Sequence, residues 1–212
     1  MTDSGKKALP PNWQWVHVNE VVSPKIDLFD KETFPKADFR YIDITSVDNA
    51  AKRVVSPRTI PTKTAPSRAT YIVHTGDILI ATVRPNLNAV AKIEPVYDGA
   101  VCSSGFCVLR FKEGFCADYF FYFFLSPQFV SAVTELVQGA MYPAISDDDV
   151  KAFRVPAPVT LDDQMNVAAK LEAKWQALQA LRSAAAKQFE AATALPVATL
   201  REFFDFENVV HA

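Results

Sequence analysis

Residues 162–194, DDQMNVAAKLEAKWQALQALRSAAAKQFEAATA, contain neither glycine nor proline. Apolar residues recur along this run at steps of three and four, the spacing that places side chains on one face of an α-helix. The run therefore predicts a single helix of about 33 residues, roughly 50 Å long at 1.5 Å per residue. Thr160 and Asp163 have the spacing of an N-cap and its acidic box residue, and Pro196 is expected to end or kink the helix.

The apolar face of this predicted helix needs a partner. A helix of this length cannot bury such a face against a small domain alone, so we expect it to pair with another long helix in a coiled coil. The alternative is a helix that packs along its own domain. The residues expected at the helix contact are Leu171, Trp175, Leu178, Leu181, Ala185 and Phe189.

The chain before the helix has the pattern of an α/β (α+β) domain. Alternating or continuously apolar segments of the kind found in strands occupy residues 36–44, 71–74, 78–83, 89–93, 100–111 and 153–158. Residues 117–138 change to a helical period that Ser126-Pro127 interrupts, which predicts two helices. Residues 46–67, rich in Ser, Thr, Pro, Lys and Arg, are predicted to form a long ordered loop.

Two parts are therefore expected. Residues 1–158 should form one globular domain with a twisted, mainly antiparallel sheet core. Residues 159–212 should form a long coiled-coil spacer helix and a C-terminal helical segment. Half of the 212 residues are hydrophobic and 22% are charged, which is typical of a chain with a packed core.

Charge is distributed unevenly along a chain whose net charge is −2. Residues 35–92 carry nine Lys or Arg and four Asp, a net of +5, whereas residues 93–160 have a net of −4. Such polarity is compatible with a local positive surface for nucleic acid on an acidic protein. It is equally compatible with a set of unrelated solvated faces.

The motifs of most enzyme classes are missing from the sequence. Its cysteines, at 102, 107 and 116, form no CxxC pair, and its histidines, at 17, 74 and 211, have no metal-ligand spacing. It has no phosphate-binding loop and no GxGxxG motif. We therefore expect no catalytic residue, metal or cofactor. Without an apolar leader or a run of 18 apolar residues, the expectation is a cytoplasmic protein with reduced thiols and no membrane span.

Six short segments occur in a fixed order between residues 9 and 164. They are LPPNW (9–13), YIDITSVD (41–48), APSRA (65–69), GDILIATVRPNL (76–87), QGAMYPAI (138–145), and VPAP (155–158) with Gln164. Together they resemble motifs of the specificity (S) subunits of Type I restriction-modification systems. The departures from the family pattern are Asn12 for Gly, Ala157 for Leu and Asp163 for Glu.

The resemblance implies a non-catalytic DNA-recognition subunit without a cofactor. Such a subunit directs a modification methyltransferase and a restriction subunit to a bipartite target in double-stranded DNA. A full S subunit has two target-recognition domains and two long antiparallel helices, so this chain resembles a half subunit. We expect it to form a homodimer through the long helix.

The residues expected to contact DNA are basic or polar and lie in predicted loops: Lys52, Arg53, Arg58, Lys63, Arg68, Arg84, Asn86, Gln138, Met141 and Tyr142. The basic residues suit backbone phosphates, and Arg84 also suits a guanine edge. Three alternatives stay open: a solvated basic loop, a structural Arg84 paired with Asp77 or a carbonyl, and a purely structural turn at residues 138–143.

A second function class also remains open at this stage. The chain could be a coiled-coil interaction or regulatory protein that derives from an S subunit and does not read DNA. Salt-dependent binding to duplex DNA distinguishes the two classes, since phosphate contacts weaken steeply with salt.

Overall fold

The computed structural model describes residues 9–137, 141 and 143–204, with side chains as far as Ala194. The chain divides into two compact units, one ending at Ala168 and the other beginning at Ala169. The mixed sheets, the helices and the long C-terminal helix confirm the predicted α+β class.

The described strands form three sheets. A five-stranded sheet has the order β10 (Phe106–Leu109), β7 (Ile78–Ala81), β8 (Val90–Lys92), β4 (Arg53–Val54), β3 (Val47–Asp48). A four-stranded sheet has the order β5 (Arg58–Pro61), β2 (Asp38–Ile42), β9 (Val101–Ser103), β6 (Ala69–Ile72). The third sheet pairs β1 (Trp13–His17) with β11 (Arg154–Pro158). Neighbouring strands are antiparallel except for the pairs β2–β9 and β4–β8, so the predicted antiparallel character is confirmed.

The α-helices are α1 (Val18–Val21), α2 (Ala117–Phe124), α3 (Pro127–Leu136), α4 (Asp147–Lys151) and α5 (Leu161–Phe204). Short 3-10 helices lie at η1 (Ile44–Ser46), η2 (Thr62–Thr64), η3 (Pro85–Leu87) and η4 (Pro95–Tyr97). The predicted break at Ser126-Pro127 is confirmed, because the Ser126 side chain accepts from the N–H of Phe129 and caps α3. Within the described part of the chain, no helix combines the length and apolar character of a membrane span.

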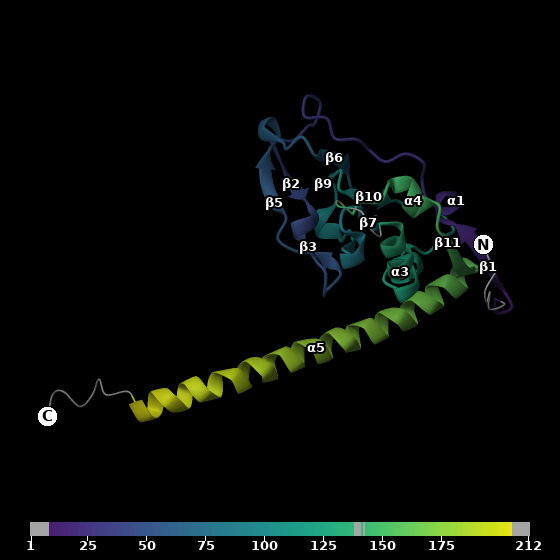
Figure 1. Cartoon of the computed structure of the whole chain (residues 1–212). Helices are drawn as coiled ribbons and strands as arrows, with labels where there is room; N and C mark the ends of the chain where they lie inside the picture. The colour runs from purple at the N-terminus through teal and green to yellow at the C-terminus, as the bar shows by residue number, and fades with distance from the viewer. Residues whose placement is uncertain (1–8, 138–140, 142, 205–212) are drawn as a thin grey trace. The chain divides into compact units, whose positions relative to one another are not determined.

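Strand β7 explains why residues 78–81 are apolar without alternation. Ile78 and Ile80 pack into one core cluster with the aromatic side chains of α2 and α3. Leu79 and Ala81 point to the opposite face and pack into a second cluster, between the five-stranded and four-stranded sheets. Figure 1 shows the same layering, with β2 and β5 on one side of β7 and β10 and with α3 and α4 on the other. A strand covered on both faces buries every side chain.

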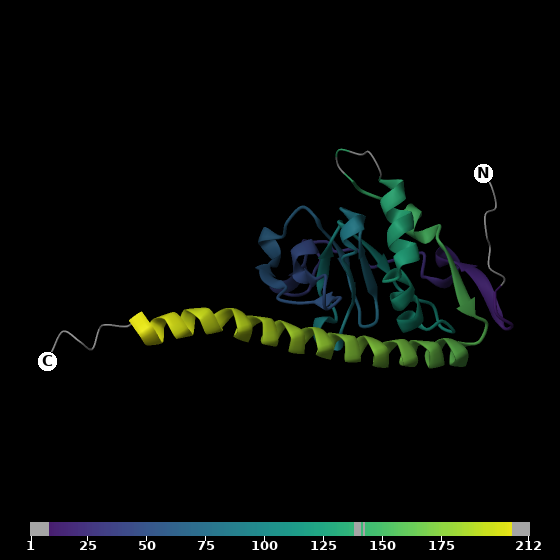
Figure 2. The same ribbon diagram turned by 60° about the horizontal axis from the view of Figure 1, so that its bottom comes forward.

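Strand β1, near the beginning of the domain, pairs with β11, the strand that precedes α5. Its five residues pair antiparallel with β11, from Trp13 opposite Pro158 to His17 opposite Arg154. Figure 2 shows the two strands side by side. The LPPNW and VPAP motifs, about 140 residues apart in the sequence, are thus joined in one β-ribbon.

The start of α5 is fixed by side chains of the motif that precedes it. Thr160 Oγ1 accepts from the N–H of Asp163 at 3.1 Å and donates to its carboxylate at 2.7 Å, so the predicted cap is confirmed. Gln164 is 1% exposed. Its amide donates to the Pro158 carbonyl and accepts from the N–H of Cys116, both at 3.0 Å. A buried amide needs such partners, which gives the motif glutamine a structural role.

Two predictions about local structure were wrong, and a third was wrong in one of its two alternatives. Residues 46–67 are not one loop, because they contain β3, β4, β5 and η2. The apolar run 100–111 is not one strand, because a turn at residues 104–105 separates β9 from β10, and the two belong to different sheets. Of the two alternatives for Pro196, only the end of the helix is wrong, because α5 continues to Phe204. A proline removes one helical hydrogen bond, and helix-forming residues on both sides keep the rest.

Candidate nucleic-acid interface

Residues 82–88 leave the end of β7 in an unusual conformation. The N–H and hydroxyl of Thr82 both donate to the Gly105 carbonyl, at 2.9 and 3.0 Å. Arg84 and Asn88 have φ of 51° and 47°, in the left-handed region that non-glycine residues rarely adopt. Between them η3 turns the chain, and Arg84, Asn86 and Leu87 are exposed. The segment therefore presents a cation, an amide and an apolar side chain to solvent.

A second segment, residues 143–145, pairs directly with the first. Val83 and Ala144 form an antiparallel bridge. The N–H of Arg84 donates to the Pro143 carbonyl, and the N–H of Ile145 donates to the Thr82 carbonyl, both at 2.9 Å. Met141 is 87% exposed. The structure thus joins residues 82–84 to residues 143–145, which sequence reasoning had placed in two separate loops.

Gln138 and Tyr142, the other two residues predicted for this surface, lie outside the described residues. Their role in DNA contact stays a prediction.

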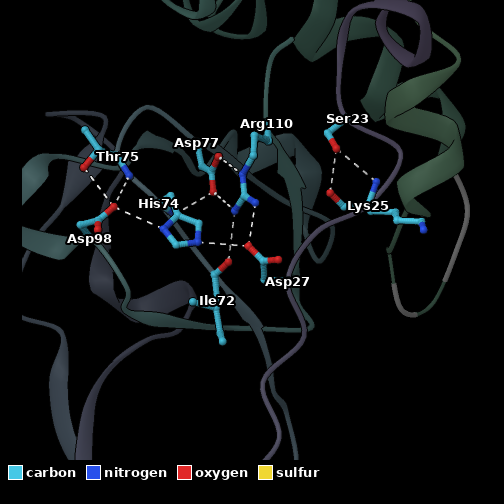
Figure 3. Close-up of polar contacts among 9 residues, drawn as sticks. All are labelled: Ser23, Lys25, Asp27, Ile72, His74, Thr75, Asp77, Asp98 and Arg110. Carbon is cyan, nitrogen blue, oxygen red and sulfur yellow. Dashed lines mark hydrogen bonds and ion pairs between the residues drawn. The ribbon is translucent and has the colours of Figure 1, made fainter. Parts of the chain in front are cut away.

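The alternative partner of Arg84, Asp77, is occupied by a different arginine. Figure 3 shows Arg110 between Asp77 and Asp27. Its Nε and Nη2 donate to the two carboxylate oxygens of Asp77, at 3.0 and 2.9 Å, and its Nη1 donates to Asp27 at 2.8 Å. The hydrogen bonds that Arg110 donates to Asp77 are the largest cause that raises the pKa of Arg110. Among the described residues Arg110, not Arg84, pairs with Asp77, and Arg84 is exposed.

His74 extends this polar cluster. Its Nε2 lies 3.1 Å from the carboxylate of Asp27, and its Nδ1 lies 3.4 Å from that of Asp98. The hydrogen bond from Arg110 is the largest cause that lowers the pKa of Asp27, and the bond from the Thr75 N–H is the largest for Asp98. The cluster in Figure 3 fastens residue 27 to the strands of the domain, and we assign it a structural role.

The five basic residues predicted to contact phosphates do not lie on one loop. Arg53 belongs to β4 of the five-stranded sheet, and Arg58 belongs to β5 of the four-stranded sheet. Arg58 forms an ion pair with Asp43 at 2.8 Å. Exposed pairs of this kind contribute about 0–1 kcal/mol, so Arg58 can still exchange its partner. Lys63 and Arg68 are exposed.

Lys52 is the exception in this basic set. Its side chain is half-buried, and its ammonium donates to the backbone carbonyl of Asn88. Sequence reasoning missed this contact and missed Asn88. The one signal for it was the residue type, since asparagine tolerates the left-handed conformation better than most residues.

The structure gives no indication of a metal or thiol site among the residues that it describes. No group of three or more His, Cys, Asp or Glu side chains there is arranged to hold a metal ion. The three cysteines are free, and burial raises the pKa of Cys102 and Cys107, which disfavours the reactive thiolate.

The residues predicted for helix pairing lie on α5. Leu171 and Trp175 are half-buried, whereas Leu178, Leu181, Ala185 and Phe189 are exposed. Leu181 and Phe189 have exposed fractions of 69% and 73%. Apolar side chains so exposed along one helix are typical of an interaction surface.

Comparison with known proteins gives a consistent result. The sequence profile described as "Type I restriction modification DNA specificity domain" matches residues 10–184. No curated protein sequence matches the chain. Two solved structures cover 95% of it: a chain from a study of complex assembly and conformational transition of the type I R-M system, and the HsdS subunit from Thermoanaerobacter tengcongensis. They share 32% and 33% identity with it, at TM-scores of 0.83 and 0.77.

A third solved structure supports the fold alone. The S subunit of a Type-I restriction-modification system from M. genitalium has 16% identity and a TM-score of 0.52 over 93% of the chain. The match covers 47% of that protein and 52% of each of the other two, so the chain spans about half the length of these solved relatives.

Proposed function

Because the chain belongs to the family of Type I restriction modification DNA specificity domains, we propose that it recognises a DNA sequence and directs a separate methyltransferase to it. The observation that carries this proposal is the bridge between segments 82–88 and 143–145. Arg84 and Asn86 are exposed beside this bridge. Arginine can bind O6 and N7 of guanine, and asparagine can bind N6 and N7 of adenine.

The proposed division of labour has two kinds of contact. The exposed basic side chains of Arg53, Lys63 and Arg68 neutralise phosphates and set the position of the duplex. The Arg84 segment contacts base edges. In this proposal the chain carries no catalytic group, and methyl transfer and cleavage belong to the modification and restriction subunits.

The assembly proposal rests on α5 and on the half-length match. The helix has 44 residues, roughly 66 Å at 1.5 Å per residue, and bears an exposed apolar face. Two copies paired antiparallel about a two-fold axis would bury this face and hold two recognition domains apart. The target would then consist of two identical half-sites in opposite orientation, separated by more than one helical turn of DNA, about 34 Å.

A binding titration over a salt series tests the DNA proposal. We expect the logarithm of the association constant for duplex DNA to fall linearly with the logarithm of salt, by about 0.9 for each phosphate contact. The competing candidate is a helix-mediated interaction protein without DNA reading, which the same exposed face of α5 favours. Helix-mediated dimerisation without measurable affinity for any duplex at low salt would establish that candidate instead.

A further inference from the structure

Lys52 lies in the tight turn between β3 and β4. Its φ of 57° is in the left-handed region, and its N–H donates to the Asp48 carbonyl at 2.7 Å. The Asp48 carboxylate accepts from the N–H groups of Ala50 and Ala51 at 2.8 and 3.0 Å. These bonds, that from Ala51 foremost, lower the pKa of Asp48. The backbone of Lys52 is therefore fixed by contacts inside its own turn.

From this turn the ammonium group of Lys52 reaches Asn88, which closes η3. It donates to the Asn88 carbonyl, 36 residues away in the sequence. The N–H of Asn88 donates to the Pro85 carbonyl at 2.9 Å. The side-chain oxygen of Asn88 is buried and accepts no hydrogen bond from a described residue. Because the Asn88 side chain adds no hydrogen bond of its own, the bond from Lys52 is a side-chain contact that fixes this end of the segment from outside it.

The segment 84–88 is thus held at both ends by residues outside it. The Pro143 carbonyl holds Arg84, and the Lys52 ammonium holds Asn88. Between these two attachments lie the exposed side chains of Arg84 and Asn86. If the hydrogen bond at either end is lost, the backbone between them is less fixed, and so is the orientation in which these side chains meet a base edge.

We propose that Lys52 is a positioning residue for base reading and does not contact a DNA phosphate. It holds the segment that presents Arg84 and Asn86, and its charge is directed into the protein. The proposal rests on the proposed DNA-reading function and replaces the phosphate role that the basic sequence pattern predicts for this residue.

The two roles differ in what they do to binding. A phosphate contact strengthens binding to every sequence. It also adds about one unit to the salt slope, which is the fall in the logarithm of the association constant for each tenfold rise in salt concentration. A residue that positions base-reading side chains changes affinity for the preferred sequence and leaves nonspecific affinity and the salt slope nearly unchanged.

The experiment compares Lys52→Gln with Arg53→Gln, which removes the same charge from the adjacent, exposed residue. The probes are a duplex selected by the wild-type chain from a random pool and a scrambled duplex of equal length, each titrated over a salt series. For K52Q we expect roughly 5- to 150-fold weaker binding to the selected duplex, the range of one lost bidentate base contact. The scrambled duplex and the salt slope should be unaffected. K52R, whose guanidinium can donate to the same carbonyl, should restore most of the affinity. R53Q should weaken both duplexes alike and lower the slope by about one.

Hydrogen exchange tests the attachment without DNA. The amides of Leu87 and Asn88, which donate within η3, should exchange faster in K52Q than in the wild type and stay unchanged in R53Q, with the thermal midpoint as the check on folding. The proposal is overturned if K52Q weakens both duplexes equally and lowers the slope by about one, or if these two amides exchange as in the wild type. A wild-type chain without duplex affinity would refute the proposed function, and the exchange rates would still decide whether Lys52 holds the segment.

Discussion

Removing Arg110 should destabilise the domain, because the buried carboxylate of Asp77 then loses its charged partner. Asp77 is 2% exposed and accepts from Nε and Nη2 of Arg110 and from the N–H of His74. In Arg110→Met the apolar part of the side chain is kept, and Asp77 retains only the backbone bond. Breaking a buried pair in this way costs about 3–5 kcal/mol. The exposed contact to Asp27 adds about 0–1 kcal/mol.

Urea unfolding in a Trp175→Phe background measures this loss, because the fluorescence then reports on Trp13 and Trp15, which lie in the globular unit. A loss of about 3–5 kcal/mol would also lower the melting temperature by roughly 6–20 °C, at about 2–4 °C per kcal/mol. The control is Asp27→Asn, which removes only the exposed contacts and should cost at most about 1 kcal/mol.

The double variant Asp77→Asn/Arg110→Met sharpens the test. Without the buried charge, the two substitutions together should cost less than Arg110→Met alone. A loss below about 1 kcal/mol for Arg110→Met, or a double variant in which the two losses simply add, would refute the reasoning.

Three further predictions concern acid stability, phosphate contacts and assembly. The pKa of Asp27 is lower in the folded chain than its ordinary value of 3.8, so ionised Asp27 stabilises the fold fully above pH 3.8, and this stabilisation is lost as the pH falls through the folded pKa. In Asp27→Asn the urea midpoint of unfolding should therefore fall less steeply below about pH 4 than in the wild type, and an equal dependence on pH in both proteins would contradict this. Reversing Lys63 and Arg68 to Glu should weaken binding to all duplexes and lower the salt slope by about two in fluorescence titrations, and an unchanged affinity would place these residues away from DNA. Sedimentation should show a dimer that Leu178→Asp/Leu181→Asp converts to a monomer, whereas a wild-type monomer at tens of micromolar would exclude self-pairing.

Periodicity in the sequence predicted the elements whose pattern is long or distinctive. The run at residues 78–83 correctly indicated a buried strand, and the helical period with Ser126-Pro127 correctly indicated α2 and α3. The start of α5 followed from Thr160 and Asp163, because a cap acts through local hydrogen bonds. In each case the interactions that decide the structure lie within a few residues of the pattern.

Elements that depend on distant partners could not be predicted in the same way. Strands β3 and β4 have two residues each and exist because β4 pairs with β8, so no local period reveals them. The bridge from Val83 to Ala144 joins residues 61 positions apart. The same limit explains why Lys52 was assigned to DNA: its charge is visible in the sequence, but its acceptor, the Asn88 carbonyl, is not.

A map of methylated positions tests the central claim most directly. Cells that express the chain with its modification methyltransferase would be compared with cells that express the methyltransferase alone, and with cells that carry Arg84→Ala. We predict one motif of two inverted half-sites with a fixed spacer, methylated only when the chain is present and weakened or altered by Arg84→Ala. A methylation pattern that does not depend on the chain would contradict the account.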